Sequence, residues 1–207
     1  MSGQPYNSQP IVLASASKVR RRLLQAAGIE LEIVPANIDE ASIREALLAG
    51  GNDVDPGDTA EVLARTKADD VGQRMAGRLI VAGDQILAFD GRIFEKPADH
   101  NEARANLLAL SGRSHALHSA VVLASDGEIV WAHIDSVQVK FRDLSPEFVG
   151  RYMARAGDGV LSSVGCYELE GLGVHLIEHI EGDYFSVLGL PLYALLAELR
   201  KLGAIES

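Results

Sequence analysis

IVLASASKVRRRLLQAAG, residues 11–28, contains a strand, a turn and a helix in direct succession. The first four residues form an apolar run of strand length that ends at Ser15. Apolar residues then recur at helical spacing, and Gly28 is the usual residue just past a helix end. Residues 29–33 alternate apolar and acidic side chains, as a half-buried strand does. This order of elements predicts an α/β fold.

The rest of the chain mixes helices with hairpins. Asp90-Gly91 and Asp126-Gly127 predict two tight turns between strands, at 86–94 and 115–140. Ser145-Pro146 predicts a helix from 146 to about 155. Asp58 is the expected cap of a helix over 58–75. Further expected elements are helices at 42–49, 99–112 and 190–202, a strand at 79–81, a loop over 50–58 and a strand-like stretch over 165–176. We expect one α/β domain with a mixed sheet over 11–203, after a flexible lead at 1–10.

Composition excludes several classes of protein. The 207 residues carry a net charge of -10, with 47% hydrophobic and 23% charged residues, as in an ordinary globular protein. A sequence pI near 5.0 argues against a nucleic-acid polymer as partner. The single cysteine, Cys166, cannot form an internal disulfide. No apolar run approaches the ~20 residues that span a bilayer, so we predict a cytoplasmic protein that does not enter a membrane.

Three polar segments could carry chemistry. The turn at 15–22 has hydroxyl groups before a basic helix start, where an anion would be stabilised; alternatively, Ser17 is only a helix cap and the arginines are solvated. Asp84 follows an apolar strand, a position from which a carboxylate holds a metal or accepts a proton, although a turn aspartate explains it equally well. Asp39-Glu40 is open to the same two interpretations.

Three further residues are weaker candidates. Lys96 lies between Glu95 and a rigid Pro97, and Lys67 follows a capping signal. A lone lysine is most often a solvated surface group. His115 is likewise more often structural than catalytic when it stands alone.

Taken together, these segments resemble the ordered motifs of the Maf-like nucleoside triphosphate pyrophosphatases, close to the branch that acts on 7-methyl-GTP. The resemblance runs from about residue 11 to 202. It rests on LASASKVRR at 13–21, IDE at 38–40, Lys67, GDQ at 83–85, KP at 96–97, LSGRSH at 110–115, GCY at 165–167, EGLG at 170–173 and GLPL at 189–192.

The resemblance implies an elongated α/β fold similar to the inosine triphosphatases, with a curved mixed sheet and a cleft between two lobes. It implies hydrolysis of a nucleoside triphosphate to the monophosphate and pyrophosphate, with Mg²⁺ or Mn²⁺, by a homodimer. The implied roles are a proton acceptor at Asp84, triphosphate binding at Ser15, Arg20, Arg21, Lys67 and Lys96, and metal binding at Glu40 with Asp84.

Substrate choice is expected to depend on three positions. Gln85 and Glu170 match the branch associated with 7-methyl-GTP, whereas Val19 differs from both branches. A carboxylate at Glu170 could accept hydrogen bonds from guanine or offset the charge of a methylated ring. The alternatives are a pyrophosphatase for dTTP or UTP, and a nucleotide-binding regulator of septum formation.

Overall fold

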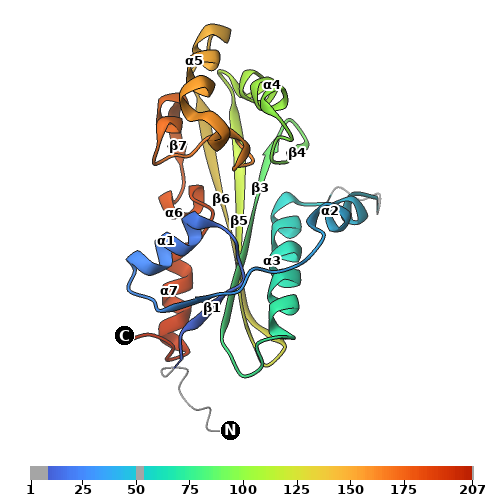
Figure 1. The fold of residues 1–207 in the computed structure, drawn as a ribbon, viewed down its shortest axis with the longest axis vertical. Helices are drawn as coiled ribbons and strands as arrows, with labels where there is room; N and C mark the ends of the chain where they lie inside the picture. Colours follow the sequence, from blue (N-terminus) through green and yellow to red (C-terminus); the bar gives the residue numbers. More distant parts are fainter. Residues whose placement is uncertain (1–8, 50–53, 207) are drawn as a thin grey trace. The chain divides into compact units, whose positions relative to one another are not determined.

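A computed structural model describes residues 9–49 and 54–206. These residues form a mixed α/β structure with a seven-stranded sheet in the order β2-β1-β3-β5-β6-β7, and β4 pairs with β3 (Figure 1). The strands are β1 (Ile11–Leu13), β2 (Leu31–Ile33), β3 (Ile80–Phe89), β4 (Arg92–Phe94), β5 (Ser114–Ser125), β6 (Glu128–Phe141) and β7 (Ile177–Glu181). β1 pairs in parallel with β2 and β3, whereas β4 and β7 pair antiparallel with their neighbours. The predicted mixed sheet with flanking helices is confirmed.

The chain divides into two compact units. Unit 1 comprises Met1–Gln85, Ser119–Asp135 and Gly189–Ser207, and unit 2 comprises Ile86–His118 and Ser136–Leu188. The three long strands β3, β5 and β6 each contribute residues to both units. The predicted boundaries of the lead and the domain, and the predicted cleft between two lobes, stay predictions; residues 1–8 of the lead lie outside the described residues.

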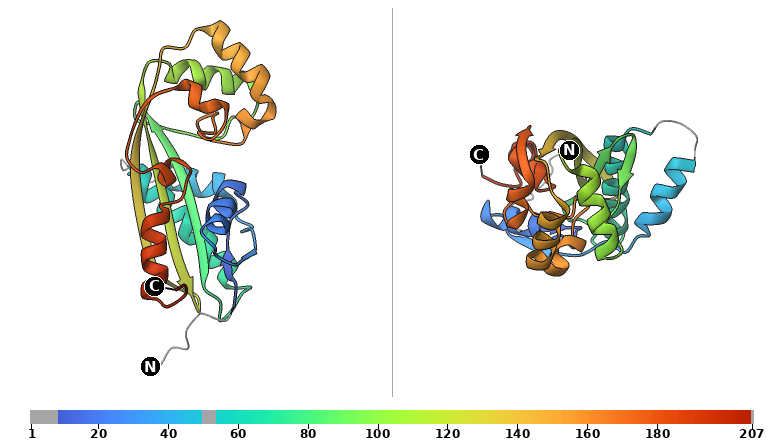
Figure 2. Two further views of the ribbon diagram at one scale, coloured as in Figure 1. Left: turned by 90° about the vertical axis from the view of Figure 1, so that its left-hand side faces the viewer. Right: turned by 90° about the horizontal axis from the view of Figure 1, so that it is seen from above.

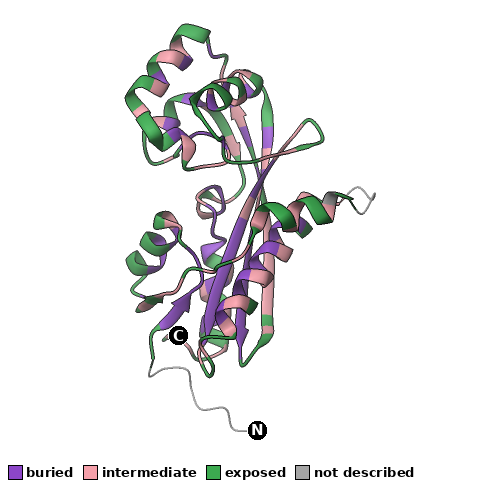
Figure 3. Ribbon diagram, turned by 45° about the vertical axis from the view of Figure 1, so that its right-hand side comes forward, coloured by how far each residue is buried: buried purple, intermediate pink, exposed green. Residues whose placement is uncertain are grey.

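Unit 1 is a sheet covered on both faces. Its helices are α1 (Lys18–Ala26), α2 (Glu40–Ala49), α3 (Pro56–Gly72) and α7 (Leu192–Lys201). Helices α1 and α7 lie over one face of the strands and α3 lies over the other (Figures 1 and 2). The first five residues of β3 are buried between these layers, and Leu63 and Val71 of α3 are fully buried (Figure 3). A strand covered on both faces reads as a continuous apolar run, which explains the sequence at 79–82.

Unit 2 contains α4 (His100–Leu110), α5 (Pro146–Ala156), α6 (Tyr184–Val187) and the short 3-10 helices η1 (Gly157–Leu161) and η2 (Leu172–Leu176). Ser145 caps α5, its side chain accepting a hydrogen bond from the backbone N–H of Phe148, as the Ser-Pro pair predicts. The core of this unit includes Phe141, Leu107 and Leu110, all fully buried.

Four predictions about elements are wrong, one of them in part. The strands expected at 79–81 and 86–89 are one strand, β3, because the polar residues between them stay within it. Helix α3 begins at Pro56, capped by Asp55, whose side chain accepts hydrogen bonds from two backbone N–H groups, so Asp58 is not the cap. The stretch at 165–176 is not a strand but turns that end in η2, and β7 begins only at Ile177. Residues 50–53 of the expected loop over 50–58 lie outside the described residues, and the prediction is wrong for 56–58, which belong to α3.

Candidate active site

The pairing of β1 with β3 brings the first two polar segments together. Leu13 is the register partner of Val81, and the backbone N–H of Ala14 donates to the carbonyl of Val81. Ser15 follows the carboxyl end of β1, whereas Asp84 lies within β3, three residues after the register partner of Leu13. The prediction that Asp84 follows a strand is therefore wrong. In open α/β sheets the carboxyl ends of parallel strands are where ligands bind, and Ser15 lies at such an end.

Asp84 faces a lysine from the helix packed over the strand. Lys67 Nζ lies 2.5 Å from Asp84 Oδ1 and 3.0 Å from Glu40 Oε1, so one ammonium bridges two carboxylates. Lys67 lies on the buried face of α3, four residues from both Leu63 and Val71. The Lys67 side chain is 9% exposed and that of Asp84 is 10% exposed. Removing two such charges from water costs several kcal/mol per ion, a cost that buried groups at functional sites commonly bear.

Arg20 is a second buried cation in unit 1. Its Nε donates to the carbonyl of Gly189 at 2.7 Å, and its Nη1 donates to Ser15 Oγ at 3.3 Å. Burial lowers the pKa of Arg20, while the negative charges of Asp84 and Glu40 act in the opposite direction. An arginine keeps its proton in proteins. Arg20 therefore adds a fixed positive charge to the field of the two carboxylates.

Two glycines leave room for this arginine. A Cβ at Gly83 would lie 2.9 Å from the carbonyl oxygen of Ala120 and 3.4 Å from Arg20 Nε. Gly189 has a φ of +91°, and a Cβ there would lie 3.5 Å from both Arg20 Nη2 and Gln85 Oε1. The close approach of the Ala120 carbonyl thus leaves no room for a Cβ at Gly83, whereas at Gly189 the distances are ordinary contacts and the positive φ favours glycine.

Within unit 1 the structure gathers five of the predicted residues, Ser15, Arg20, Glu40, Lys67 and Asp84. Arg21 is exposed, so of the two candidate arginines only Arg20 belongs to this buried cluster, and Val19 is half-buried. The sequence indicates which arginine is buried. Arg20 precedes the buried Leu23 and Leu24 by three and four positions, and this spacing places all three on the same face of the helix.

Gln85 has a partner that the sequence did not predict. Its Nε2 donates to Ser119 Oγ at 3.0 Å, and Ser119 is fully buried in β5. The two residues are 34 positions apart, and only the pairing of β3 with β5 brings them together. The register between β3 and β5 cannot be derived from a local sequence pattern, so the sequence does not indicate the contact between Gln85 and Ser119.

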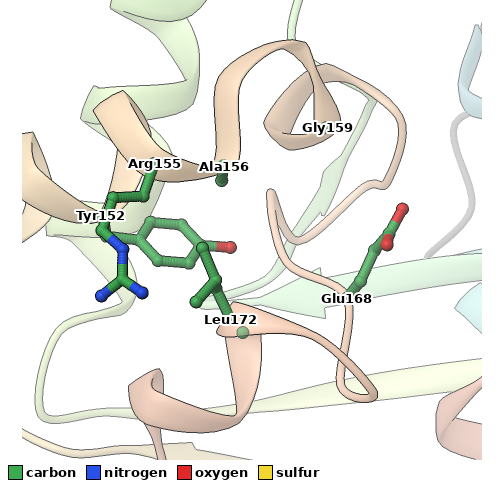
Figure 4. A pocket seen from close by; sticks show the side chains of 7 residues that line it. Tyr152, Arg155, Ala156, Gly159, Glu168 and Leu172 are labelled. Atoms are coloured by element: carbon green, nitrogen blue, oxygen red, sulfur yellow. The ribbon is translucent and has the colours of Figure 1, made fainter.

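Lys96 and Glu170 belong to unit 2, where both are exposed. This unit also has a cavity of about 230 Å³ lined by Tyr152, Arg155, Ala156, Gly159, Glu168, Leu172 and Gly173 (Figure 4). None of these seven residues is a predicted site residue. The chemistry that the sequence predicts is therefore concentrated at the buried ions of unit 1 and not at this cavity.

Glu40 and Asp84 supply carboxylate oxygens of the kind that could hold a divalent cation. Both carboxylates already share one cation, Lys67, and two carboxylates plus phosphate oxygens are a usual set of ligands for Mg²⁺. Among the described residues, no three His, Cys, Asp or Glu side chains are grouped so as to hold a metal ion. The residues therefore suit an ion completed by substrate, and not a closed protein cage.

Two buried cations beside a pair of carboxylates, close to the end of β1, define a site suited to a phosphorylated ligand. The family model of the Maf-like proteins matches residues 10–202, and the chain belongs to this family.

Named relatives match nearly all of the chain. A 7-methyl-GTP pyrophosphatase of Mesorhizobium japonicum is 48% identical over 97% of this chain and 100% of its own length. A 7-methyl-GTP pyrophosphatase of Rhizobium meliloti is 45% identical, with 95% and 98% covered. A nucleoside triphosphate pyrophosphatase of Nitrobacter winogradskyi is 44% identical, with 93% and 94% covered.

Among solved structures, a dITP/XTP pyrophosphatase of Mycobacterium abscessus is similar with a TM-score of 0.37 and 20% identity, covering 66% of this chain and 76% of that one. A similarity of this size supports no conclusion about the site.

In the part of the chain that the structure describes, no helix is long and apolar enough to cross a membrane.

The tight space around Gly83 generates a prediction. Gly83→Ala forces the added methyl against the Ala120 carbonyl and the Arg20 guanidinium, so we expect the free energy of unfolding to fall by about 1–3 kcal/mol. Urea titration measures this change. Gly159→Ala is the matched control, because nothing lies within 4 Å of its Cβ position and its φ is not positive. Equal stability of the two variants would contradict the packing described for Arg20.

Proposed function

We propose that this chain hydrolyses nucleoside triphosphates to the monophosphate and pyrophosphate, acting at the buried ions of unit 1. The observation that carries the proposal is the Lys67 ammonium between Asp84 and Glu40, with the Arg20 guanidinium in the same charge cluster. The names of the relatives, which cover at least 93% of this chain at 44–48% identity, support the same reaction.

Asp84 is the proposed proton acceptor. A water molecule attacks the α-phosphorus, the bond from that phosphorus to the bridging oxygen breaks, and pyrophosphate leaves with the electron pair. Asp84 takes the proton that the water loses. Its Oδ1 is held by Lys67, and this contact fixes the orientation of the carboxylate. A base held on a strand between packed layers needs little reorganisation during the reaction.

The cations stabilise charge on the phosphates. Lys67 is placed to exchange part of its contact with the carboxylates for a phosphate oxygen, and the Ser15 hydroxyl lies at the adjacent strand end. Arg21 and Lys96 are exposed and so accessible to an anion. Preorganised positive groups of this kind supply much of the rate in phosphoryl transfer.

A divalent cation completes the proposed site. Glu40 and Asp84 would hold Mg²⁺ or Mn²⁺ together with substrate phosphates. When bound, the ion neutralises the charge that develops on the departing pyrophosphate. When the ion is absent, the Lys67 ammonium contacts both carboxylates, so their double negative charge is not left uncompensated.

7-Methyl-GTP is the proposed substrate. Glu170 supplies a carboxylate that can accept from the guanine N1–H and amino groups, or offset the positive charge of the methylated ring. The names of the Mesorhizobium and Rhizobium relatives support this choice. Gln85 and Val19 are the other proposed contributors to base selection. The second candidate is a broader activity that includes dTTP and UTP, which the more general name of the Nitrobacter relative favours.

Three further features belong to the proposal. The enzyme acts in the cytoplasm, as a homodimer, on free nucleotides and not on nucleic-acid polymers. The chain has 29 acidic and 19 basic residues, so its net charge of -10 repels a polyanion. This charge supports action on free nucleotides and not on nucleic-acid polymers. A small triphosphate needs only the few cations of the site.

A panel of triphosphates with Mg²⁺, with Mn²⁺ and with excess chelator tests the proposed reaction. We expect pyrophosphate release, fastest with 7-methyl-GTP, and loss of turnover in chelator that either ion restores. Release of orthophosphate, or no turnover of any nucleotide, would falsify the proposed reaction. Full activity in chelator would contradict the role given to Glu40.

Removing the proposed base has a distinct signature. Asp84→Asn keeps the side-chain shape but cannot accept the proton, so kcat should fall by about 10²–10⁴-fold. Single-turnover assays with quantified pyrophosphate measure this change. Asp69→Asn is the control, because it removes a negative charge from an exposed position of the same helix as Lys67.

The same variant separates the enzyme from a regulator of septum formation. Retained nucleotide binding with loss of both turnover and any effect on cell division would support the enzyme. A persistent effect on cell division without turnover would favour regulation through binding.

Base selection is tested at Glu170. Glu170→Gln removes the charge, and we expect the ratio of kcat/KM for 7-methyl-GTP to that for UTP to fall about 10-fold or more, the size expected for a lost hydrogen bond to a charged group. Glu168→Gln is the matched control, because Glu168 is also an exposed acid of unit 2. An unchanged ratio in Glu170→Gln would favour the broader pyrophosphatase.

A further inference from the structure

A buried imidazole of unit 2 takes no part in the proposed chemistry. His115 lies in β5, is 2% exposed, and its Nε2 lies 3.0 Å from the Tyr167 hydroxyl. The two rings and Phe141 pack edge to face, with centroids 5.0–5.8 Å apart. His115 Nδ1 has no hydrogen-bond partner among the described residues. Among the described residues, the Tyr167 hydroxyl is thus the hydrogen-bond partner of the His115 imidazole.

The His115 ring is neutral at physiological pH. Burial lowers its pKa to about 4, because the charged form would lose its hydration. Burial also raises the pKa of Tyr167 far above its usual value. Both groups are therefore uncharged near pH 7.

Tyr167 belongs to the loop over 165–173, which carries Glu170. Its backbone N–H donates to Ser163 Oγ at 3.0 Å, and the same hydroxyl donates to its carbonyl at 2.9 Å. The preceding residue, Cys166, has a φ of +59°, and its carbonyl accepts from the Tyr152 hydroxyl at 2.9 Å. A non-glycine residue with positive φ needs this kind of support from its surroundings.

Two glycines fit closely around Tyr167. A Cβ at Gly165 would lie within 3 Å of the Tyr167 ring, at 2.7 Å from Cδ1. A Cβ at Gly173 would lie 2.8 Å from Tyr167 Cβ and 2.5 Å from the Glu168 carbonyl oxygen. The two ends of the loop over 165–173 therefore pack against the same tyrosine.

Glu170 lies in a tight turn directly after this anchor. The backbone N–H of Gly171 donates to the Glu168 carbonyl at 3.1 Å, and that of Val174 donates to the Gly171 carbonyl at 3.3 Å. Only two residues separate Glu170 from Tyr167, and the turn between them is closed by hydrogen bonds. A movement of the tyrosine is thus transmitted to the Glu170 backbone.

The loop also packs against its surroundings. Leu169 and Leu172 pack against the core of unit 2. Glu168, Leu172 and Gly173 line the cavity of about 230 Å³ together with Arg155 and Ala156 of α5 (Figure 4). Tyr167 is buried, and its hydrogen bond with His115 connects the loop to β5.

We propose that His115 and Tyr167 are positioning residues for base selection, because their hydrogen bond holds the loop that presents Glu170 to the nucleobase. The inference rests on the proposed function and adds to it the residues that set the orientation of the selecting carboxylate. It also gives a role to the LSGRSH and GCY motifs, which lie 52 positions apart at the two bonded residues.

The test measures selectivity in two variants that lose the same bond. Tyr167→Phe and His115→Phe each keep an aromatic ring. We expect both to lower the ratio of kcat/KM for 7-methyl-GTP to that for UTP by about 3- to 10-fold, from the usual worth of a buried hydrogen bond. The change should appear mainly in KM for 7-methyl-GTP, with kcat for UTP within about twofold of wild type, since the charge cluster of unit 1 is untouched.

A control separates positioning from loss of stability. Ser145→Ala removes the cap of α5 in the same unit and should lower stability without changing the ratio. The second arm combines Tyr167→Phe with Glu170→Gln. Because the pair acts through Glu170, the ratio in the double variant should be no lower than in Glu170→Gln alone.

The outcomes distinguish the two proposals. Three results would overturn the positioning role and leave the proposed function standing. They are an unchanged ratio in both single variants, an equal loss of turnover with every nucleotide, and effects that multiply in the double variant. Absence of pyrophosphate release from the wild-type chain would overturn the function, and the positioning role with it.

Discussion

The contact between Lys67 and Asp84 constrains the rest of unit 1. Two opposite charges with about a tenth of each side chain exposed are stable only as a pair, because either one alone would lose its hydration without compensation. The strand that carries Asp84 must therefore lie under the helix that carries Lys67. Glu40 at the start of α2 and Arg20 in α1 then add one further charge of each sign.

This balance suits a site that alternates between two partners. Without a ligand, the cations are compensated by carboxylates of the chain. In the proposed function, the triphosphate brings negative charge of its own, so the contacts of Lys67 would shift toward it with little net change in charge. A site built in this way is stable when empty and is preorganised for an anion.

Particular residues show how much of this could be predicted from the sequence. The motifs single out Asp84, Lys67 and Glu40, and the change from strand to helix pattern singles out the turn at Ser15; their roles stay predictions. The motif does not distinguish Arg20 from Arg21, whereas the spacing of buried residues in α1 indicates which of the two is buried. Ser119 and the His115–Tyr167 bond depend on strand registers and on a loop with an unusual backbone at Cys166, and no local pattern reports these. The same lack of a local signal led to the wrong prediction of a strand over 165–176.

The bond from Arg20 to Gly189 joins residues that are 169 positions apart. During synthesis, a chain folds from its N-terminal end as it emerges from the ribosome. Arg20, Lys67 and Asp84 are therefore made long before the carbonyl that accepts from Arg20 and before α7, which covers their sheet. A nascent polypeptide that stops short of residue 189 therefore lacks both the carbonyl that accepts from Arg20 and helix α7 of unit 1.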